Sequence, residues 1–399
     1  MSHLQGVFMT GILVIASFPL IYYVLASVAA WRFSRGAEER VSGSFQPPVS
    51  ILKPLHGVDF ASYENYASFC HQHYPAEYEI LFAVNEQSDP AAAVVRRLIG
   101  DFPQRTIKLL IGAEYFGANR KVNSLARLAR EAKYEVLALS DGDVRVTAQY
   151  LQNVVAPLQD PAVGAVTSFY RGIAQKNLGA EFEAIGASSA FFAGVLMAVW
   201  TEGVKFALGA SIATTKTWLR KIGGFEEIAA FLADDYEIGR RVAEAGGRVV
   251  LSHETVWTMY PEQTVRGFWE HQLRWARTVR LCRPISYAAL FFTQGLPWAI
   301  AAAVVAPASW IAVAYLVAYL VLRLAMAWIV GVTVARDEVL RRRWWLVPFW
   351  DAIHFVVSVA SFASNHIVWG NVEYVVNGGR MKPVVSGEAR RASAAQIDR

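Results

Sequence analysis

The chain has 399 residues, of which 54% are hydrophobic and 18% are charged, whereas soluble domains contain about 45–50% and about 25%. Its 13 Trp, 16 Tyr and 22 Phe exclude a disordered chain, and its two cysteines, Cys70 and Cys282, exclude a disulfide scaffold or a CxxC motif. The net charge of +5 and the pI of about 9.1 favour an anionic lipid or a phosphorylated ligand as partner. No basic stretch is interleaved with aromatic residues that look exposed, so we expect no nucleic-acid partner.

An uncharged apolar segment near the N-terminus, residues 8–31, predicts a transmembrane anchor. It is long enough to cross a hydrocarbon core of about 30 Å. Because no Lys or Arg precedes it, we expect an anchor rather than a cleaved signal peptide. Arg32, Arg35 and Arg40 follow it, and the positive-inside rule then places the N-terminus outside and the residues after Arg32 in the cytoplasm.

The next 240 or so residues have an ordinary globular composition and alternate predicted strands with predicted helices. We expect strands at residues 49–54, 78–84, 106–111 and 136–139, and helices at residues 60–71, 89–98 and 123–132. This alternation predicts an α/β fold with a mostly parallel sheet. Ligands of such sheets bind at the carboxyl ends of the strands.

Five aspartates stand at positions where they could form one site. Asp89 and Asp141 each follow a predicted strand, and Asp141 and Asp143 share one Gly turn. Paired carboxylates of this kind suit Mg²⁺ or Mn²⁺, although a DxD can also be a solvated turn. Asp234 and Asp235 precede a predicted helix, where an Asp can also serve only as a cap.

Two later stretches could contact the membrane or a lipid. Residues 182–206 are apolar and rich in Gly and Ala, and they are either a core helix of the catalytic domain or a wall of the entrance for a lipid. Residues 263–283 form one basic, amphipathic stretch, which predicts a helix at the membrane surface. Arg274 within it could also clamp a diphosphate.

Further apolar runs at residues 285–306 and 310–335 are each long enough to span, and Arg323 in the second should face a partner or a cavity. Residues 345–369 either span or form a broken, re-entrant segment, since they contain Asp351 and His354. The basic tail favours a cytoplasmic end, whereas three full spans would place it outside. We divide the chain into residues 1–43 (anchor and linker), 44–284 (cytoplasmic domain ending in the interfacial helix), 285–370 (membrane segments) and 371–399 (tail).

The aspartates and the basic stretch together resemble a known motif series. Asp89, the Asp141–Asp143 turn, Asp234–Asp235 and Arg274–Trp275 are similar to the D, D(x)D, (E/D)D and (Q/R)xxRW motifs of inverting membrane glycosyltransferases of the GT-A fold. Residues 51–59, 117–125 and 140–146 most resemble ceramide glucosyltransferases and their bacterial relatives, including hopanoid glycosyltransferases. One position departs from the series, because His271 stands where the last motif has Gln or Arg.

The resemblance implies a role for each matching residue. Asp235 would be the catalytic base and Asp143 would hold a divalent metal, Mg²⁺ or Mn²⁺. The nucleotide-sugar would be bound by Asp89, Lys121, Asn123, Asp141, Asp234, Arg274 and Trp275. The implied reaction moves glucose or N-acetylglucosamine from a UDP-sugar to a hydroxyl of a ceramide or hopanoid type of membrane lipid, which gives a β-glycolipid.

Two alternatives stay open from the residues alone. A processive polysaccharide synthase of the same fold would need more spans for its channel. A transporter or non-catalytic scaffold would not need the aspartates, and a transporter would need more spans. The charge pattern and the lack of a retention signal favour a multi-pass protein of a bacterial inner membrane.

Overall fold

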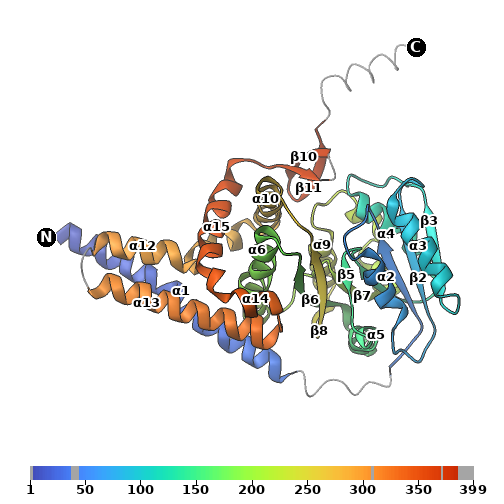
Figure 1. Ribbon diagram of the computed structural model, residues 1–399, viewed down its shortest axis with the longest axis horizontal. Helices are drawn as coiled ribbons and strands as arrows, with labels where there is room; N and C mark the ends of the chain where they lie inside the picture. Colours follow the sequence, from blue (N-terminus) through green and yellow to red (C-terminus); the bar gives the residue numbers. More distant parts are fainter. Residues whose placement is uncertain (1–2, 37–44, 307–309, 370–371, 385–399) are drawn as a thin grey trace, which may run out of the picture.

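A single eight-stranded sheet runs through the globular part of the chain (Figure 1). The computed structural model describes residues 3–36, 45–306, 310–369 and 372–384, so Arg40 and the last part of the predicted tail lie outside it. The strand order is β3-β2-β1-β4-β7-β6-β8-β5. The strands are β1 (Val49–Pro54), β2 (Tyr78–Val84), β3 (Thr106–Ile111), β4 (Val136–Ser140), β5 (Val144–Arg145), β6 (Val163–Ala174), β7 (Ser211–Thr215) and β8 (Arg248–Tyr260).

The predicted α/β class and mostly parallel sheet are confirmed. Strands β1, β2, β3 and β4 pair in parallel, and so do β6 and β8. Strand β7 runs antiparallel between β4 and β6, and the short β5 runs antiparallel to β8. The first three strands have the bounds that the sequence predicted, because each is an apolar run closed by turn residues.

Helices cover both faces of this sheet because its central strands are apolar on both sides. Ile51 and its neighbours of the same parity pack against α2 (Ser62–Cys70), α3 (Pro90–Asp101) and α5 (Tyr150–Val155). Leu52 and the alternate residues pack against α4 (Arg120–Glu131), α8 (Lys216–Lys221) and α9 (Asp234–Glu244). All the carboxyl ends of the parallel strands therefore open toward one edge, where α4 and α9 begin.

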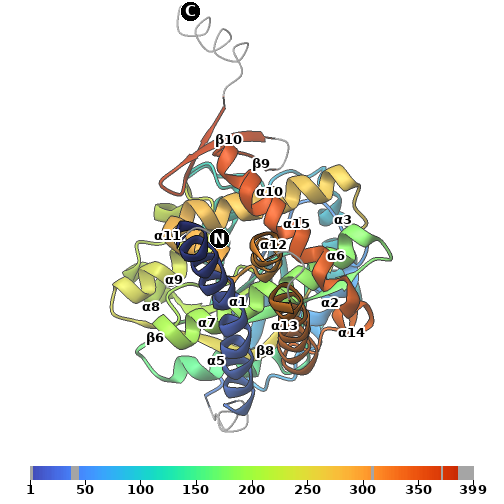
Figure 2. The same ribbon diagram turned by 90° about the vertical axis from the view of Figure 1, so that its left-hand side faces the viewer.

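The apolar helices gather on one side of the sheet domain (Figures 1 and 2). They are α1 (His3–Arg35), the continuous α6 (Leu178–Gly186), π-turn (Ala187–Phe191) and α7 (Phe192–Glu202), then α11 (Pro284–Leu290), α12 (Gly295–Val305), α13 (Trp310–Ala327) with its π-turn (Trp328–Val334), α14 (Glu338–Arg343) and α15 (Val347–Ala360). Four helical stretches in the described part of the chain are long and apolar enough to cross a membrane.

Two of the expected spans differ from a straight helix. The run predicted at residues 285–306 is a helix pair bent by 53° at a break next to Gln294, and it would be a fifth span only if the pair crosses as one. The run predicted at residues 345–369 is helical only to Ala363, after which the chain enters a strand at His366. The stretch at residues 182–206 is apolar enough to span a membrane and packs against α1, and both of its interpretations stay predictions.

Arg323, which lies in the predicted span α13, is paired with an acidic side chain, as an arginine at membrane depth requires. Arg323 Nη2 donates to Asp351 Oδ1 at 2.8 Å and Arg323 Nε donates to Asp351 Oδ2 at 3.0 Å. Its Nη1 also donates to the carbonyl of Ser189 in the π-turn at 3.3 Å. The pair therefore joins α13, α15 and the centre of the 178–202 helix, and both charges are compensated inside the protein.

A second, small sheet follows the last apolar helix. It has the order β11-β10-β9 and consists of β9 (His366–Trp369), β10 (Val372–Asn377) and β11 (Arg380–Pro383). Its apolar side, formed by Ile367, Tyr374, Val376 and Met381, packs against Leu232 of the globular domain. Residues 372–383, which the sequence suggested as part of a tail, thus belong to the folded protein next to α9.

Candidate functional site

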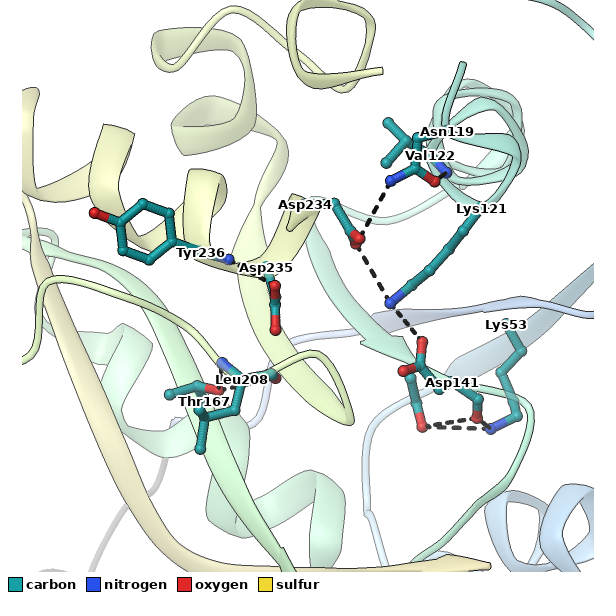
Figure 3. Close-up of polar contacts among 11 residues, drawn as sticks. Lys53, Asn119, Lys121, Val122, Asp141, Thr167, Leu208, Asp234, Asp235 and Tyr236 are labelled. Carbon is teal, nitrogen blue, oxygen red and sulfur yellow. Dashed lines mark hydrogen bonds and ion pairs between the residues drawn. The ribbon is translucent and has the colours of Figure 1, made fainter. Parts of the chain in front are cut away.

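The carboxyl edge of the sheet brings a lysine and three aspartates together (Figure 3). Lys121 on the first turn of α4 places its Nζ 2.6 Å from Asp141 Oδ1 and 3.3 Å from Asp234 Oδ2. Burial disfavours its ammonium form, but the carboxylates of Asp141, Asp234 and Asp235 outweigh that effect, so the pKa of Lys121 is raised. The lysine therefore stays charged and holds two loops of the site together.

The helix caps explain why these side chains meet. Asn119 caps α4 by accepting from Val122 N–H, and its Nδ2 donates to Phe231 C=O at 2.9 Å and to Asp234 Oδ1 at 3.4 Å. Asp234 and Asp235 form the first turn of α9, where negative charge is favoured by the helix dipole. Two helix N-termini therefore face each other across the edge.

Gly209 leaves a space at the centre of this group. A β-carbon at this position would stand 3.2 Å from Asp235 Oδ2, 3.5 Å from Lys121 Nζ and 3.6 Å from Asp141 Oδ2. The loop that carries Gly209 is fixed by Thr167, whose Oγ1 accepts from Leu208 N–H at 2.8 Å. The absence of a side chain in this loop opens a space that three charged groups surround, as a polar ligand requires.

Asp235 faces the space at Gly209 with a carboxyl group that can accept a proton. Burial and the neighbouring Asp234 raise its pKa to about 6, against the lowering effect of Lys121. Its Oδ1 accepts from Tyr236 N–H at 2.8 Å, which fixes the side chain at the helix start. Since a general base works best with a pKa near the working pH, this carboxylate is poised for proton abstraction.

The turn after β4, which carries Asp141 and Asp143, is fixed by a buried lysine. Lys53 is fully buried, and its Nζ donates to Asp141 C=O at 2.7 Å and to Ser140 Oγ at 3.3 Å. Burial lowers the pKa of Lys53 to about 7, against Asp141 and Asp143. Burial, Asp141 and Asp59 raise the pKa of Asp143 to about 7. The turn thus has an excess of negative charge that would attract a cation.

The carboxylates of this turn fit a divalent metal only if atoms of a bound ligand complete the coordination of the metal. In the described part of the chain, no three His, Cys, Asp or Glu side chains are grouped closely enough to hold a metal ion alone. Asp143 and Asp141 supply hard oxygen atoms in a place where burial makes their negative charge costly. Diphosphate oxygen atoms and water would have to supply the remaining ligands, which is usual for Mg²⁺.

Two predicted nucleotide-binding residues are engaged in the protein itself. Asp89 caps α3 by accepting from Ala91 N–H at 2.9 Å, and it also accepts from Gly57 N–H at 3.1 Å. The Asn123 side chain accepts from Phe116 and Gly117 N–H and donates to Gly117 C=O at 2.9 Å. Both side chains therefore shape loops at the rim of the site, and a direct contact with a nucleotide stays a prediction for them.

Helix α10 (Val265–Cys282), which we predicted to lie at the membrane surface, carries the last motif. Arg274 is buried enough that its pKa is lowered, although Glu183 counteracts this, and its guanidinium forms no hydrogen bond or ion pair within residues 45–306 or the other described ranges. Trp275 packs edge-on against Tyr170 and Phe191 at ring distances of 6.2 and 5.9 Å. Arg274 is half-buried, and its guanidinium N–H groups, which form no hydrogen bond among the described residues, can donate to an anion.

The aromatic cluster of Tyr170, Phe191 and Trp275 lies near the aspartates. Burial first, then Tyr260, and then Asp235 and Asp143 raise the pKa of Tyr170 well above its ordinary value, so this side chain lies within electrostatic reach of the site. Tyr170 also packs edge-on against Trp275.

His271, the departure from the motif, is fixed by an acid of the apolar helix. Its Nδ1 lies 2.6 Å from Oε1 of Glu183, whose side chain is 2% exposed. Glu183 belongs to α6, so this contact joins the interfacial helix to the 178–202 helix. The sequence marked His271 only as a departure and did not predict this partner.

Lys53, Asn119, Gly209 and Glu183 are the site residues that sequence reasoning missed. One signal was available, because a lysine in the otherwise apolar strand at residues 49–54 is buried only when it has polar partners. The other three depend on contacts with distant parts of the chain, which no local pattern indicates.

The family model of Glycosyl transferase family 21 matches residues 11–381. The chain belongs to glycosyl transferase family 21. Among its relatives, Ceramide glucosyltransferase 3 of Caenorhabditis elegans is 28% identical over 268 residues, which make up 65% of this chain and 55% of that protein. Ceramide glucosyltransferase 1 of the same organism is 28% identical over 236 residues, 58% of this chain and 49% of that protein.

This family 21 chain therefore spans about half the length of the curated relatives it matches. A solved structure, mannosyltransferase PcManGT from Pyrobaculum calidifontis in complex with GDP-Man and Mn²⁺, covers 86% of this chain and 99% of its own at 17% identity, with a TM-score of 0.44. The family membership confirms the predicted resemblance to the ceramide glucosyltransferase family. The hopanoid branch of the resemblance stays a prediction.

Proposed function

We propose that this protein transfers a hexose, glucose or N-acetylglucosamine, from a UDP-sugar to a hydroxyl group of a ceramide or hopanoid type of membrane lipid, with inversion at the sugar. The observation that carries the proposal is the space at Gly209, which Asp235, Lys121 and Asp141 surround within 3.2–3.6 Å of one point. A carboxyl group whose pKa is raised to about 6 faces that space. The family relationship to ceramide glucosyltransferases supports the choice of a lipid acceptor.

The chemistry follows from the charges around this space. Asp235 accepts the proton of the acceptor hydroxyl as the new C1–O bond forms, because a neutral hydroxyl is a poor nucleophile. The anomeric carbon passes through an oxocarbenium-like state, as in glycoside hydrolysis, and one displacement inverts its configuration. The guanidinium of Arg274 donates hydrogen bonds to the departing diphosphate and stabilises its negative charge.

A divalent cation belongs to the proposal through the turn after β4. Asp143, with Asp141, would hold Mg²⁺ or Mn²⁺, which when bound neutralises charge on the diphosphate. Lys121 and Asp234 would orient the nucleotide from the opposite side of the space. Asp89 and Asn123 would contribute through the loops that they fix.

The apolar helices suit an acceptor that stays in the bilayer. Moving a lipid chain into water costs about 0.8 kcal/mol for each CH₂ group, so an enzyme that reaches the head group at the interface avoids that cost. Phe191 and Trp275 connect the 178–202 helix with the site and would form the wall along which the acceptor enters. We propose a cytoplasmic catalytic domain and a bacterial inner membrane as its location.

The test is transfer from labelled UDP-glucose and UDP-N-acetylglucosamine to lipid vesicles, with Mg²⁺ or Mn²⁺, by wild-type protein and by Asp235→Asn. The variant should lose at least about 100-fold in transfer rate while UDP binding stays within about twofold. Asp160→Asn, at an exposed ion pair with Arg248, is the matched control and should behave as wild type. Full activity of Asp235→Asn would refute the assignment of the base.

The product distinguishes this proposal from the alternatives of the same fold and of another class. Mass spectrometry should find lipid with one added hexose. A ladder of sugars would favour the processive synthase, and the absence of any transfer with all acceptors tested would favour the scaffold.

A further inference from the structure

The loop that carries the catalytic aspartates is held from two sides. On the donor side, Asn119 N–H donates to Ala229 C=O at 2.8 Å and Asn119 Nδ2 donates to Phe231 C=O at 2.9 Å. Gly117 lies so close that a β-carbon there would be 2.4 Å from Ala229 O. The opposite side of residues 229–235 faces the small C-terminal sheet.

The hairpin formed by β10 and β11 makes the contacts on that opposite side. Leu232 N–H donates to Gly379 C=O at 2.9 Å, and Met381 N–H donates to Ala230 C=O at 2.8 Å. The guanidinium of Arg380 lies 4.7 Å from the ring centre of Phe231. Three consecutive residues of the loop, 230–232, are therefore fixed by three consecutive residues of the hairpin, 379–381, with Phe231 opposite Arg380 in an antiparallel bridge.

The same small sheet is tied to the interfacial helix α10 at its other end. Arg277 Nη1 donates to His366 C=O at 2.6 Å, at the start of β9. Arg280 Nη2 donates to Ser364 C=O at 3.0 Å and to Asn365 Oδ1 at 2.6 Å. The helix that carries Arg274 and Trp275 and the loop that carries Asp234 and Asp235 thus share one rigid neighbour.

We propose that the three-stranded C-terminal sheet is a positioning element for the proposed reaction, which sets the place of Asp235 relative to α10. The proposal rests on the proposed function for its catalytic meaning. The donor side of the site is also held by Lys53 and Asp141, which form no hydrogen bond or ion pair with this sheet among the described residues. Loss of the hairpin contact should therefore affect the transfer step more than donor binding.

One amide group allows this contact to be removed without opening the hairpin. Residues of an antiparallel strand alternate in the direction of their N–H groups. Met381 N–H points to Ala230 rather than to β10, so its loss spares the bonds between β10 and β11. Met381→Pro removes this donor, and Met381→Leu keeps it together with a side chain of similar volume.

The experiment compares these two variants as full-length protein in nanodiscs. We expect Met381→Pro to lower kcat at least about tenfold, since small misplacements of reacting groups are costly, with KM for the UDP-sugar and UDP affinity within about twofold. Met381→Leu should retain wild-type kcat. Hydrogen exchange should become faster in a peptide covering residues 229–236 of Met381→Pro only, and should stay unchanged in a peptide covering residues 120–128.

The outcomes separate this proposal from the proposed function. Wild-type kcat in Met381→Pro, with or without faster exchange of the loop, would overturn the positioning role. Equal losses of kcat, UDP affinity and thermal stability in Met381→Pro would show that the hairpin only maintains the fold, and would also overturn it. If wild-type protein transfers no sugar, the proposed function fails. Unchanged hydrogen exchange in Met381→Pro would separately refute the claim that the hairpin holds residues 229–236 in place.

Discussion

Replacing Lys121 with Met should move the pH dependence of sugar transfer. Burial and Asp234 raise the pKa of Asp235 to about 6, while Lys121 lowers it. Without the lysine the raising effects are unopposed, so the carboxylate takes up its proton at a higher pH. Since Asp235 must be ionised to act as the base, kcat is full above that pKa and falls as the pH drops through it.

The size of the shift follows from the geometry. A β-carbon on Gly209 would lie 3.2 Å from Asp235 Oδ2 and 3.5 Å from Lys121 Nζ, so these two atoms are separated by at most the sum of the distances, about 6.7 Å. At an effective dielectric constant of about 20, the attraction at that distance is about 2.5 kcal/mol, or nearly two pKa units. Because 23% of the Lys121 side chain is exposed, solvent screens part of this attraction, and we expect a rise of about one unit.

The assay is kcat as a function of pH at saturating UDP-sugar and saturating lipid. The acid limb of wild-type protein should have its midpoint near pH 6, where the Asp235 pKa lies. The midpoint of Lys121→Met should lie about one unit higher, and that of Lys121→Arg, which keeps the charge, should stay near the wild-type value. A Lys121→Met midpoint at or below that of wild type, in protein that still binds UDP, would refute this account of the site.

Three further changes test other parts of the molecule. Gly209→Val should abolish UDP binding in a calorimetric titration because its side chain fills the space beside Asp235, and unchanged affinity would remove that space from the donor site. Phe191→Ala should raise KM for the lipid several-fold without changing UDP affinity, whereas Phe192→Ala should cost about 3–5 kcal/mol of stability, since Phe192 is buried on Phe169; equal effects on lipid and donor would favour a core role for both. Arg323→Met should destabilise the protein by about 3–5 kcal/mol in thermal unfolding by leaving Asp351 unpaired, and a double variant with Asp351→Leu should recover much of that loss.

The sequence predicted the first half of the sheet well for a physical reason. The strands β1, β2, β3 and β4 are short apolar runs separated by amphipathic helices, so the local period and the turn residues define them. Strands β6, β7 and β8 were not predicted. The long 178–202 helix separates β6 from its partners β7 and β8, so that these pairings are set by the tertiary fold.

The small C-terminal sheet was missed for a different reason. Residues 364–369 continue an apolar run that composition alone cannot distinguish from the end of a membrane span. The break comes at Ser364, whose Oγ accepts from His366 N–H, and the chain then turns to face Leu232. A strand so short is stable only against a distant partner, and such partners are invisible to periodicity.

At the site, the sequence predicted which residues are present better than it predicted the contacts that each of them makes. The aspartates and Lys121 were expected at one edge, and the structure places Lys121, Asp141, Asp234 and Asp235 there together. Asp89 and Asn123 were expected near the nucleotide, yet their visible bonds are to loop backbone. A carboxylate or an amide can cap a helix as readily as bind a ligand, and sequence spacing does not separate these uses.

The hydrogen bond from Met381 N–H to Ala230 C=O can form only late in the synthesis of the chain. Met381 is added to the growing chain 146 residues after Asp235, which takes roughly 7–30 s at about 5–20 residues per second. The helices α12, α13 and α15 are synthesised in that interval, before the hairpin exists. Until the hairpin is made, the aspartate loop has contacts on its Asn119 side only, so the positioning that we propose for Asp235 is completed last.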